Sequence, residues 1–177
     1  YYAAGYHSYG LTDPSTQTLW ENLYADVQFF ASHGDVNNVQ FAESGIVVGN
    51  TGYYDCGGTT KQLIGTNAVH WDADTILVTY SSCNSAGANN NNDTNSITCK
   101  TAEKGATVAV GFRGEINTGS ATNWDKRYNQ KLGEGYGVID AVNYASSFTY
   151  LDLDVKKVQI WHHGDANMKI GKYRSVG

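Results

Sequence analysis

Two short runs of this chain are apolar almost throughout, residues 75–80 (TILVTY) and residues 106–112 (ATVAVGF). A continuous apolar run of this length suits a strand that is covered on both faces, the usual position of a strand inside a parallel sheet. Helix-like segments lie between and after these runs, at residues 96–104 and 136–147. The alternation predicts an α/β fold, a three-layer αβα sandwich with a mostly parallel central sheet.

Local signals predict the remaining elements. Two short apolar runs, at residues 39–42 and 45–48, predict a small β-hairpin after the first sheet strand that carries a histidine at its end. The other expected strands cover residues 2–9, 26–32 and 155–161. The other expected helices cover residues 15–25, 60–64 and 124–132, the last with Asn123 as its N-cap. Residues 53–58 are expected to form a glycine-rich loop, and residues 85–95, which are rich in glycine, alanine and asparagine, a second loop.

The length of 177 residues predicts a single domain, residues 1–177. No apolar stretch approaches the roughly 18 residues needed to cross a bilayer, so no membrane span is expected. The formal charge is −5 and the basic residues are scattered singly, which argues against nucleic acid as a partner. The chain opens on Tyr1, so we expect a mature processed form or a piece of a longer precursor. Few lysines and many tyrosines favour a secreted or cell-surface protein.

A histidine and a cysteine each follow the end of an expected strand, His33 after residues 26–32 and Cys83 after residues 75–80. In such sheets, ligand sites form outside the carboxyl ends of the strands. If the two strands are neighbours, a base and a nucleophile face each other at one sheet edge. Gly34 would let a substrate backbone approach while its amide donates to a developing oxyanion. Taken alone, each residue reads as a turn histidine or a packed cysteine, but their joint placement favours peptide-bond chemistry.

The chain holds three cysteines, Cys56, Cys83 and Cys99, so at least one is left without a disulfide partner. Cys83 is the natural odd one. Cys56 and Cys99 either form a disulfide or stay as two thiols, because the sequence gives no distance between them.

Five short segments occur in a particular order along the chain. They are residues 32–34 (SHG), 79–85 (TYSSCNS), 104–112 (KGATVAVGF), 132–141 (LGEGYGVIDA) and 164–165 (GD). In this order they resemble the caspase-like cysteine peptidases, which include caspases, gingipains, clostripain, legumain, separase and CHAT domains. The resemblance is closest in motif style to the gingipain-like and CHAT domains and covers most of a core at residues 16–170. His33 also precedes Cys83 by about the 50 residues that are typical of caspases.

The resemblance implies a cysteine endopeptidase in which Cys83 attacks the peptide bond and forms a thioester acyl-enzyme, with His33 as general acid/base. The backbone amides of Gly34 and Cys83 are the implied oxyanion donors. The substrate is then a protein or a peptide, and the dyad requires no cofactor.

One position departs from clostripain and legumain-like relatives, in which an acidic residue two before the cysteine helps to hold a basic or polar P1 side chain. Ser81 stands at that position here. The loop after residue 112 offers two other substrate-binding residues, Arg113 for an acidic P1 carboxylate and Glu115 for a basic side chain. We favour Arg113 because it directly follows the strand, and solvated loop charges are the alternative reading of both residues.

The main alternative function is a catalytically silent caspase-like domain that acts as an extracellular binding or adhesion module through its aromatic side chains. A Ca²⁺ site formed by Asp152, Asp154 and Asp165 is a further alternative, although their spacing is not that of an EF-hand loop. His162 and His163 are expected at a strand end and should not chelate one ion, because neighbouring residues on a strand point to opposite faces.

Overall fold

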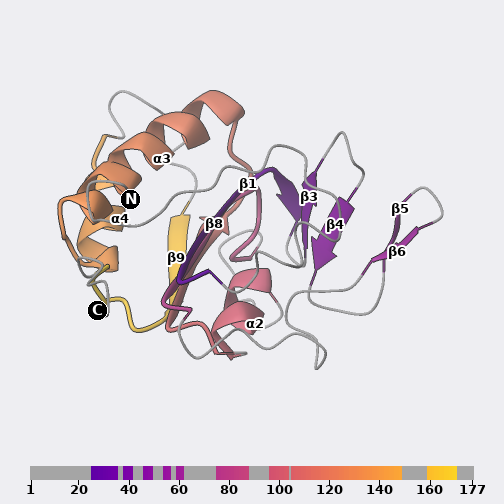
Figure 1. The fold of residues 1–177 in the computed structure, drawn as a ribbon. Helices are drawn as coiled ribbons and strands as arrows, with labels where there is room; N and C mark the ends of the chain where they lie inside the picture. The colour runs from indigo at the N-terminus through magenta and orange to yellow at the C-terminus, as the bar shows by residue number, and fades with distance from the viewer. Residues whose placement is uncertain are drawn as a thin grey trace.

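The computed structural model describes residues 25–35, 38–41, 46–49, 54–56, 59–61, 75–87, 96–103, 105–148 and 159–170. Its central sheet has four strands in the order β1-β7-β8-β9 (Figure 1). They are β1 (Val27–Ala31), β7 (Leu77–Ser81), β8 (Val108–Arg113) and β9 (Gln159–Gly164). The first three strands are parallel to one another, and β9 is antiparallel to β8. The mostly parallel sheet that the sequence predicts is therefore confirmed.

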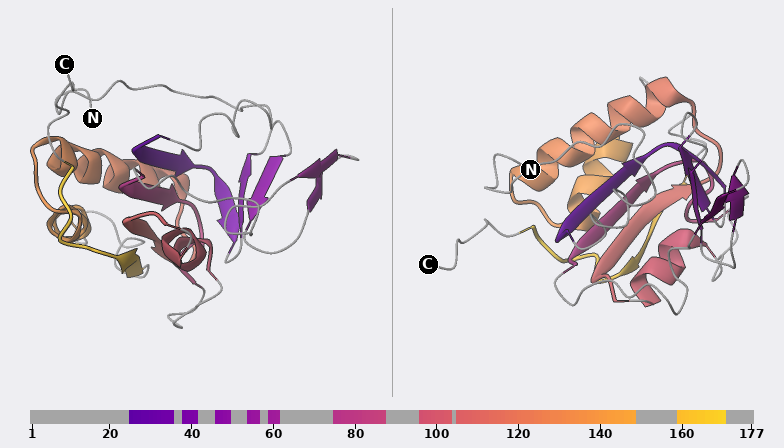
Figure 2. Two further views of the ribbon diagram at one scale, coloured as in Figure 1. Left: turned by 60° about the horizontal axis from the view of Figure 1, so that its bottom comes forward. Right: turned by 45° about the vertical axis from the view of Figure 1, so that its right-hand side comes forward.

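Helices cover both faces of this sheet (Figure 2). Helices α3 (Thr118–Gly133) and α4 (Val138–Ser146) pack together on one face, and α2 (Ile97–Glu103) lies on the other. The main core lies between the sheet and the α3–α4 pair. Its buried members are Leu77, Val108, Val110, Phe112, Trp124, Tyr128, Leu132, Val138, Ala141, Val142, Ala145 and Ile170. The described part of the chain is thus a three-layer α/β sandwich, as predicted.

The alternation of side chains along β7 determines what each face of the sheet carries. Leu77 joins the core beneath α3, and Thr79 Oγ1 lies 3.3 Å from Tyr128 Oη on the same helix. Tyr80 points the other way, and its hydroxyl oxygen lies 2.6 Å from Thr101 Oγ1 on α2. Every residue of β7 is buried, which is the environment expected for an apolar strand between two helical layers.

Two small antiparallel sheets follow β1 along the chain. The first joins β2 (His33–Asp35), β3 (Asn38–Phe41) and β4 (Ile46–Gly49), so the predicted hairpin is confirmed. The second pairs β5 (Tyr54–Cys56) with β6 (Thr59–Lys61). The loop expected over residues 53–58 and the helix expected from residue 60 are therefore wrong. The register pairs Tyr54 with Lys61 and Cys56 with Thr59.

Helix α3 begins earlier than the sequence predicts. Its N-cap is Asn117, whose Oδ1 accepts a hydrogen bond from the Ser120 amide at 2.8 Å, and Asn123 lies inside the helix. The predicted start was wrong because Thr118, Gly119 and Ser120 have low helix propensity. The capping bond from Asn117 outweighs that local preference.

Strand β9 runs further than expected, to Gly164 instead of residue 161. The helices predicted over residues 96–104 and 136–147 are confirmed as α2 and α4. The elements expected over residues 2–9 and 15–25, most of the loop at 85–95 and the first part of the strand at 155–161 lie outside the described residues. No helix in the described ranges has the length and apolar content that a bilayer span requires.

Candidate active site

The carboxyl ends of β1 and β7 lie side by side, as the candidate pair requires. The last residues of the two strands are in register, and the Ser32 amide donates to Ser81 O at 3.4 Å. The Oγ atoms of Ser32 and Ser82 are 3.4 Å apart. His33 and Cys83 are the residues directly after these two serines. The structure therefore brings the two segments that carry the candidate residues to the same edge of the sheet.

His33 is the first residue of β2 and is exposed. It pairs with Gln40 on β3, and its carbonyl accepts a hydrogen bond from Ser32 Oγ at 2.9 Å. Gly34, the expected oxyanion donor, follows in the same strand and is half-buried. An exposed imidazole at the end of a sheet strand can be reached by a substrate, which a general acid/base needs.

Cys83 is half-buried in the turn that follows β7. Its Sγ donates to Ile116 O at 3.4 Å, just before α3 begins. The next residue, Asn84, has a φ of 56°, in the left-handed region where asparagine is enriched. The Asn84 amide donates to Gly114 O at 2.9 Å. The turn thus places the thiol against the loop between β8 and α3.

The buried hydroxyl of Ser85 stabilises the turn that carries Cys83 through hydrogen bonds to the backbone. Ser85 Oγ lies 2.9 Å from Ser82 O and 3.1 Å from Tyr80 O, and it accepts a hydrogen bond from the Phe112 amide at 3.1 Å. Gly111 makes room for it, because a Cβ at this position would lie 2.6 Å from Ser85 Oγ. The backbone around Cys83 is therefore anchored to both β7 and β8.

The structure adds an acidic residue that the sequence did not single out. Ser81 is 6% exposed, and its hydroxyl donates to Oδ2 of Asp125 on α3 at 2.8 Å. Burial raises the pKa of Asp125 from 3.8 to about 7, and the hydrogen bond from Ser81 opposes that shift. The sequence predicts a helix that starts at Trp124, which places Asp125 in the first turn, where an acidic residue is common. The helix in fact starts after Asn117, so Asp125 lies in its interior.

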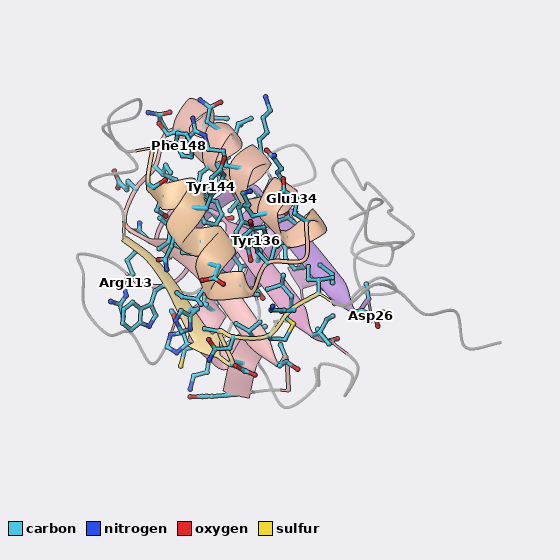
Figure 3. The ribbon with its side chains drawn as sticks, turned by 90° about the vertical axis from the view of Figure 1, so that its left-hand side faces the viewer. Asp26, Arg113, Glu134, Tyr136, Tyr144 and Phe148 are labelled. Carbon is cyan, nitrogen blue, oxygen red and sulfur yellow. The ribbon has the colours of Figure 1, made fainter. Side chains whose placement is uncertain are left out.

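The two sequence-predicted P1 residues lie in different environments. Arg113 is 5% exposed, and its guanidinium carbon lies 3.7 Å from the ring centroid of Trp161 on β9. Because Phe112 faces α3, the neighbouring Arg113 extends from the opposite face of β8. Figure 3 shows Arg113 beside β9. Glu115 is exposed in the loop before α3.

No group of three or more His, Cys, Asp or Glu side chains within the described ranges is arranged to hold a metal ion. Asp152 and Asp154 lie outside these ranges. Asp165 Oδ1 accepts a hydrogen bond from the Asn167 amide at 3.0 Å. The structure therefore offers no support for the Ca²⁺ alternative in the part of the chain that it describes.

The two adjacent histidines and the second described cysteine lie away from the β1–β7 edge. His162 and His163 are inside β9 instead of at its end, and burial lowers the pKa of both imidazoles. The Cys99 sulfur is a thiol that donates to Glu103 Oε1 at 3.6 Å. The side chain of Cys56 lies outside the described residues.

A scan against protein-family models found no match, and a search of curated proteins found none either. A function for this chain is therefore argued from the residues at the β1–β7 edge.

Proposed function

We propose that this chain is a cysteine endopeptidase of the caspase-like group, nearest in motif style to gingipain-like and CHAT domains, with Cys83 as nucleophile and His33 as general acid/base. The observation that carries the proposal is the contact between Ser32 and Ser82, whose Oγ atoms are 3.4 Å apart. The residue after each serine is one member of the proposed dyad.

In the proposed reaction, His33 removes the proton from the Cys83 thiol, and the thiolate attacks the carbonyl carbon of the scissile peptide bond. The backbone amides of Gly34 and Cys83 donate to the oxyanion that forms. His33 then gives its proton to the leaving amine, and the C–N bond breaks to leave a thioester on Cys83. A water molecule deprotonated by His33 hydrolyses the thioester and restores the thiol.

The surroundings of Cys83 hold the sulfur in a defined position. The thiol is half-buried and donates to Ile116 O, one residue before the N-cap of α3. This hydrogen bond has to break when His33 takes the thiol proton, because a carbonyl oxygen does not attract a thiolate. The bracing by Ser85 keeps the turn in place while the sulfur changes charge.

Protein or peptide chains are the substrates of such an enzyme, and the dyad needs no metal or cofactor. A secreted or cell-surface location stays a prediction from composition.

Exposed aromatic residues favour a second candidate, a catalytically silent domain that acts as a binding or adhesion module. Tyr136 is 46% exposed and Tyr144 is 36% exposed, and Lys131 Nζ lies 4.6 Å from each ring centroid. Figure 3 shows both tyrosines, with Phe148, along the α4 side of the molecule. Exposed rings with a polar end are common where proteins bind other molecules.

Covalent labelling with an electrophilic peptide separates the two candidates. Peptidyl acyloxymethyl ketones with mixed P1 residues should label the wild type stoichiometrically, with the adduct on Cys83 in peptide mass spectra. Cys83→Ala should abolish labelling, and His33→Ala should slow it about 100-fold or more, the usual scale of general acid–base catalysis. Cys99→Ala is the matched control, because this thiol is buried on α2 and its loss should leave labelling unchanged. Labelling that ignores both Cys83→Ala and His33→Ala would contradict the endopeptidase.

A further inference from the structure

His33 lies beyond the strand pairing that orders the central sheet at this edge. The β1–β7 ladder ends at Ala31 and Ser81. His33 and Cys83 follow these two residues at the second position. A general acid/base has to come within about 2.6–3.2 Å of the atom that it protonates or deprotonates. The placement of His33 relative to Cys83 therefore depends on contacts outside the ladder.

Two serine hydroxyls supply such contacts. Ser32 Oγ donates to the His33 carbonyl at 2.9 Å and lies 3.4 Å from Ser82 Oγ. A serine hydroxyl has one hydrogen, and a carbonyl oxygen can only accept. Because the Ser32 hydrogen goes to the His33 carbonyl, Ser82 is the donor between the two hydroxyls. The two bonds thus run in one direction, from Ser82 through Ser32 to the His33 carbonyl, and we call these three groups the hydroxyl relay.

The relay starts in the turn that carries the proposed nucleophile. Ser82 directly precedes Cys83 and is 1% exposed. Its carbonyl accepts a hydrogen bond from Ser85 Oγ at 2.9 Å, which holds the backbone at this point. A buried hydroxyl without a hydrogen bond is unfavourable, so burial favours the bond from Ser82 to Ser32. The first group of the relay is therefore held in the same turn as the thiol.

The relay ends at a peptide group that belongs to the proposed site. The His33 carbonyl and the Gly34 amide share one planar peptide group. A bond that holds the carbonyl therefore also fixes the direction of the amide, the proposed oxyanion donor, and the main chain from which the imidazole extends. The 3.4 Å between the two serine oxygens exceeds the usual separation of about 2.7–2.8 Å. Catalytic hydrogen bonds are often long before substrate binds and tighten in the complex.

We infer that Ser82 and Ser32 are positioning residues of the proposed reaction. Through the hydroxyl relay they hold the main chain of His33 at the distance from Cys83 that proton transfer requires, and they take no part in the bonds that form and break. The inference rests on the proposed function and adds two residues to its site. A misplacement of about 1 Å costs a reaction on the order of 100-fold in rate, so loss of the relay should slow the reaction of Cys83 with peptides.

Two thiol reagents separate positioning from general damage to the fold. Labelling by a peptidyl acyloxymethyl ketone requires the assembled site, whereas iodoacetamide alkylates any accessible thiolate. In Ser82→Ala and in Ser32→Ala, labelling of Cys83 by the peptidyl ketone should be about tenfold or more slower than in the wild type. Alkylation by iodoacetamide at about pH 9.5 should be unchanged, because a thiol with the ordinary pKa of about 8.5 is ionised there without help from a base. A loosened turn would instead make alkylation faster.

Three further variants show whether the two hydroxyls act as one unit. Since either substitution breaks the same relay, the double variant Ser32→Ala with Ser82→Ala should label no more slowly than the slower single variant. Ser32→Thr keeps a hydroxyl at a half-buried position and should label at the wild-type rate. Ser146→Ala is the matched control. It removes a hydroxyl that accepts from Trp124 Nε1 at 3.1 Å between α4 and α3, and its labelling rate should equal that of the wild type.

Wild-type labelling rates in both single variants would overturn the inference and leave the endopeptidase standing. The same holds if the effects of the two substitutions multiply in the double variant, since independent contributions do not make a relay. A change in iodoacetamide alkylation that parallels the change in peptidyl-ketone labelling would also overturn it, because the loss then comes from a disturbed turn. If the wild type itself is alkylated by iodoacetamide but not labelled by the peptidyl ketone, the endopeptidase falls, and the positioning role falls with it.

Discussion

Ser81 at the end of β7 donates a hydrogen bond of 2.8 Å to Asp125 on α3, a carboxyl that burial holds at a pKa of about 7. This value lies above the 3.8 of an exposed aspartate, so the folded protein binds the proton more tightly than the unfolded chain does. The stability contributed by Asp125 is therefore fully present below about pH 4 and is lost as the pH rises through about 7.

Asp125→Asn is expected to remove this pH dependence. Between about pH 5 and about pH 8, the wild type should lose roughly 2–3 kcal/mol of unfolding free energy through Asp125, at about 1.4 kcal/mol per pH unit inside the window. In Asp125→Asn, the decrease in unfolding free energy between the two pH values should be smaller by this amount. Urea unfolding at both pH values measures it. Asp140→Asn removes an exposed carboxyl and should keep the wild-type pH dependence. Identical pH dependence in the wild type and Asp125→Asn would show that Asp125 is ionised throughout this range.

Gly111→Ala is expected to destabilise the fold by about 2 kcal/mol or more. A Cβ there would lie 2.5 Å from Thr98 Oγ1 and 2.6 Å from Ser85 Oγ, so α2, β8 or the turn after β7 has to move. Thermal unfolding should show a lower Tm. Gly133→Ala is the control, because a Cβ at the end of α3 meets nothing within 4 Å, and its Tm should be unchanged or higher. A wild-type Tm for Gly111→Ala would mean that the contact relaxes without cost.

Ser85→Ala should loosen the turn that carries Cys83. The change removes the hydroxyl from two backbone carbonyls and one backbone amide, and we expect a loss of about 1–3 kcal/mol because these groups are buried. Alkylation of Cys83 by iodoacetamide should become faster, since its S–H···O bond depends on the turn. Ser147→Ala is the control, because this hydroxyl bonds Tyr144 O at an exposed helix end. If stability and alkylation rate are both unchanged in Ser85→Ala, the turn is held by its other contacts.

Arg113→Ala tests the sequence-based prediction that Arg113 binds an acidic P1 side chain. Because the guanidinium carbon lies 3.7 Å from the Trp161 ring centroid, we expect a loss of about 1–2 kcal/mol of stability through the cation–π contact and the packing of the stem. The P1 preference, measured with a library of P1-varied electrophilic peptides, should stay unchanged. Glu115→Ala is the control. Because Glu115 is exposed, its loss should change neither the stability nor the P1 preference. A shifted P1 preference in Arg113→Ala would support the acidic-P1 prediction instead.

The buried strands could be predicted because burial on both faces leaves a direct mark on the sequence. Residues 75–80 and 106–112 are apolar almost without interruption, and they form most of β7 and β8. The sequence places His33 and Cys83 directly after two expected strands. Because these strands, β1 and β7, are parallel neighbours, the two segments lie at the same edge of the sheet. Strand ends are local features, and the parallel arrangement brings them together.

Asp125 could not be predicted, because tertiary contacts create its environment. Nothing local to the residue shows that α3 starts at an Asn117 cap and lies over the end of β7. The β5–β6 pair was missed for a related reason, since glycines are equally common in loops and in tight hairpin connections. In both cases the local sequence was compatible with two structures: an earlier or a later helix start for α3, and a loop or a strand pair for β5 and β6. Contacts between residues distant in sequence decided between them.

Ser32 is the single residue between β1, which belongs to the central sheet, and β2, which belongs to the small sheet with β3 and β4. His33 therefore belongs to the small sheet, whereas Cys83 follows a strand of the central sheet. The Ser32 amide and hydroxyl contact Ser81 O and Ser82 Oγ, so they hold the chain where it passes from one sheet to the other. The relative placement of the two proposed catalytic residues is thus determined at Ser32.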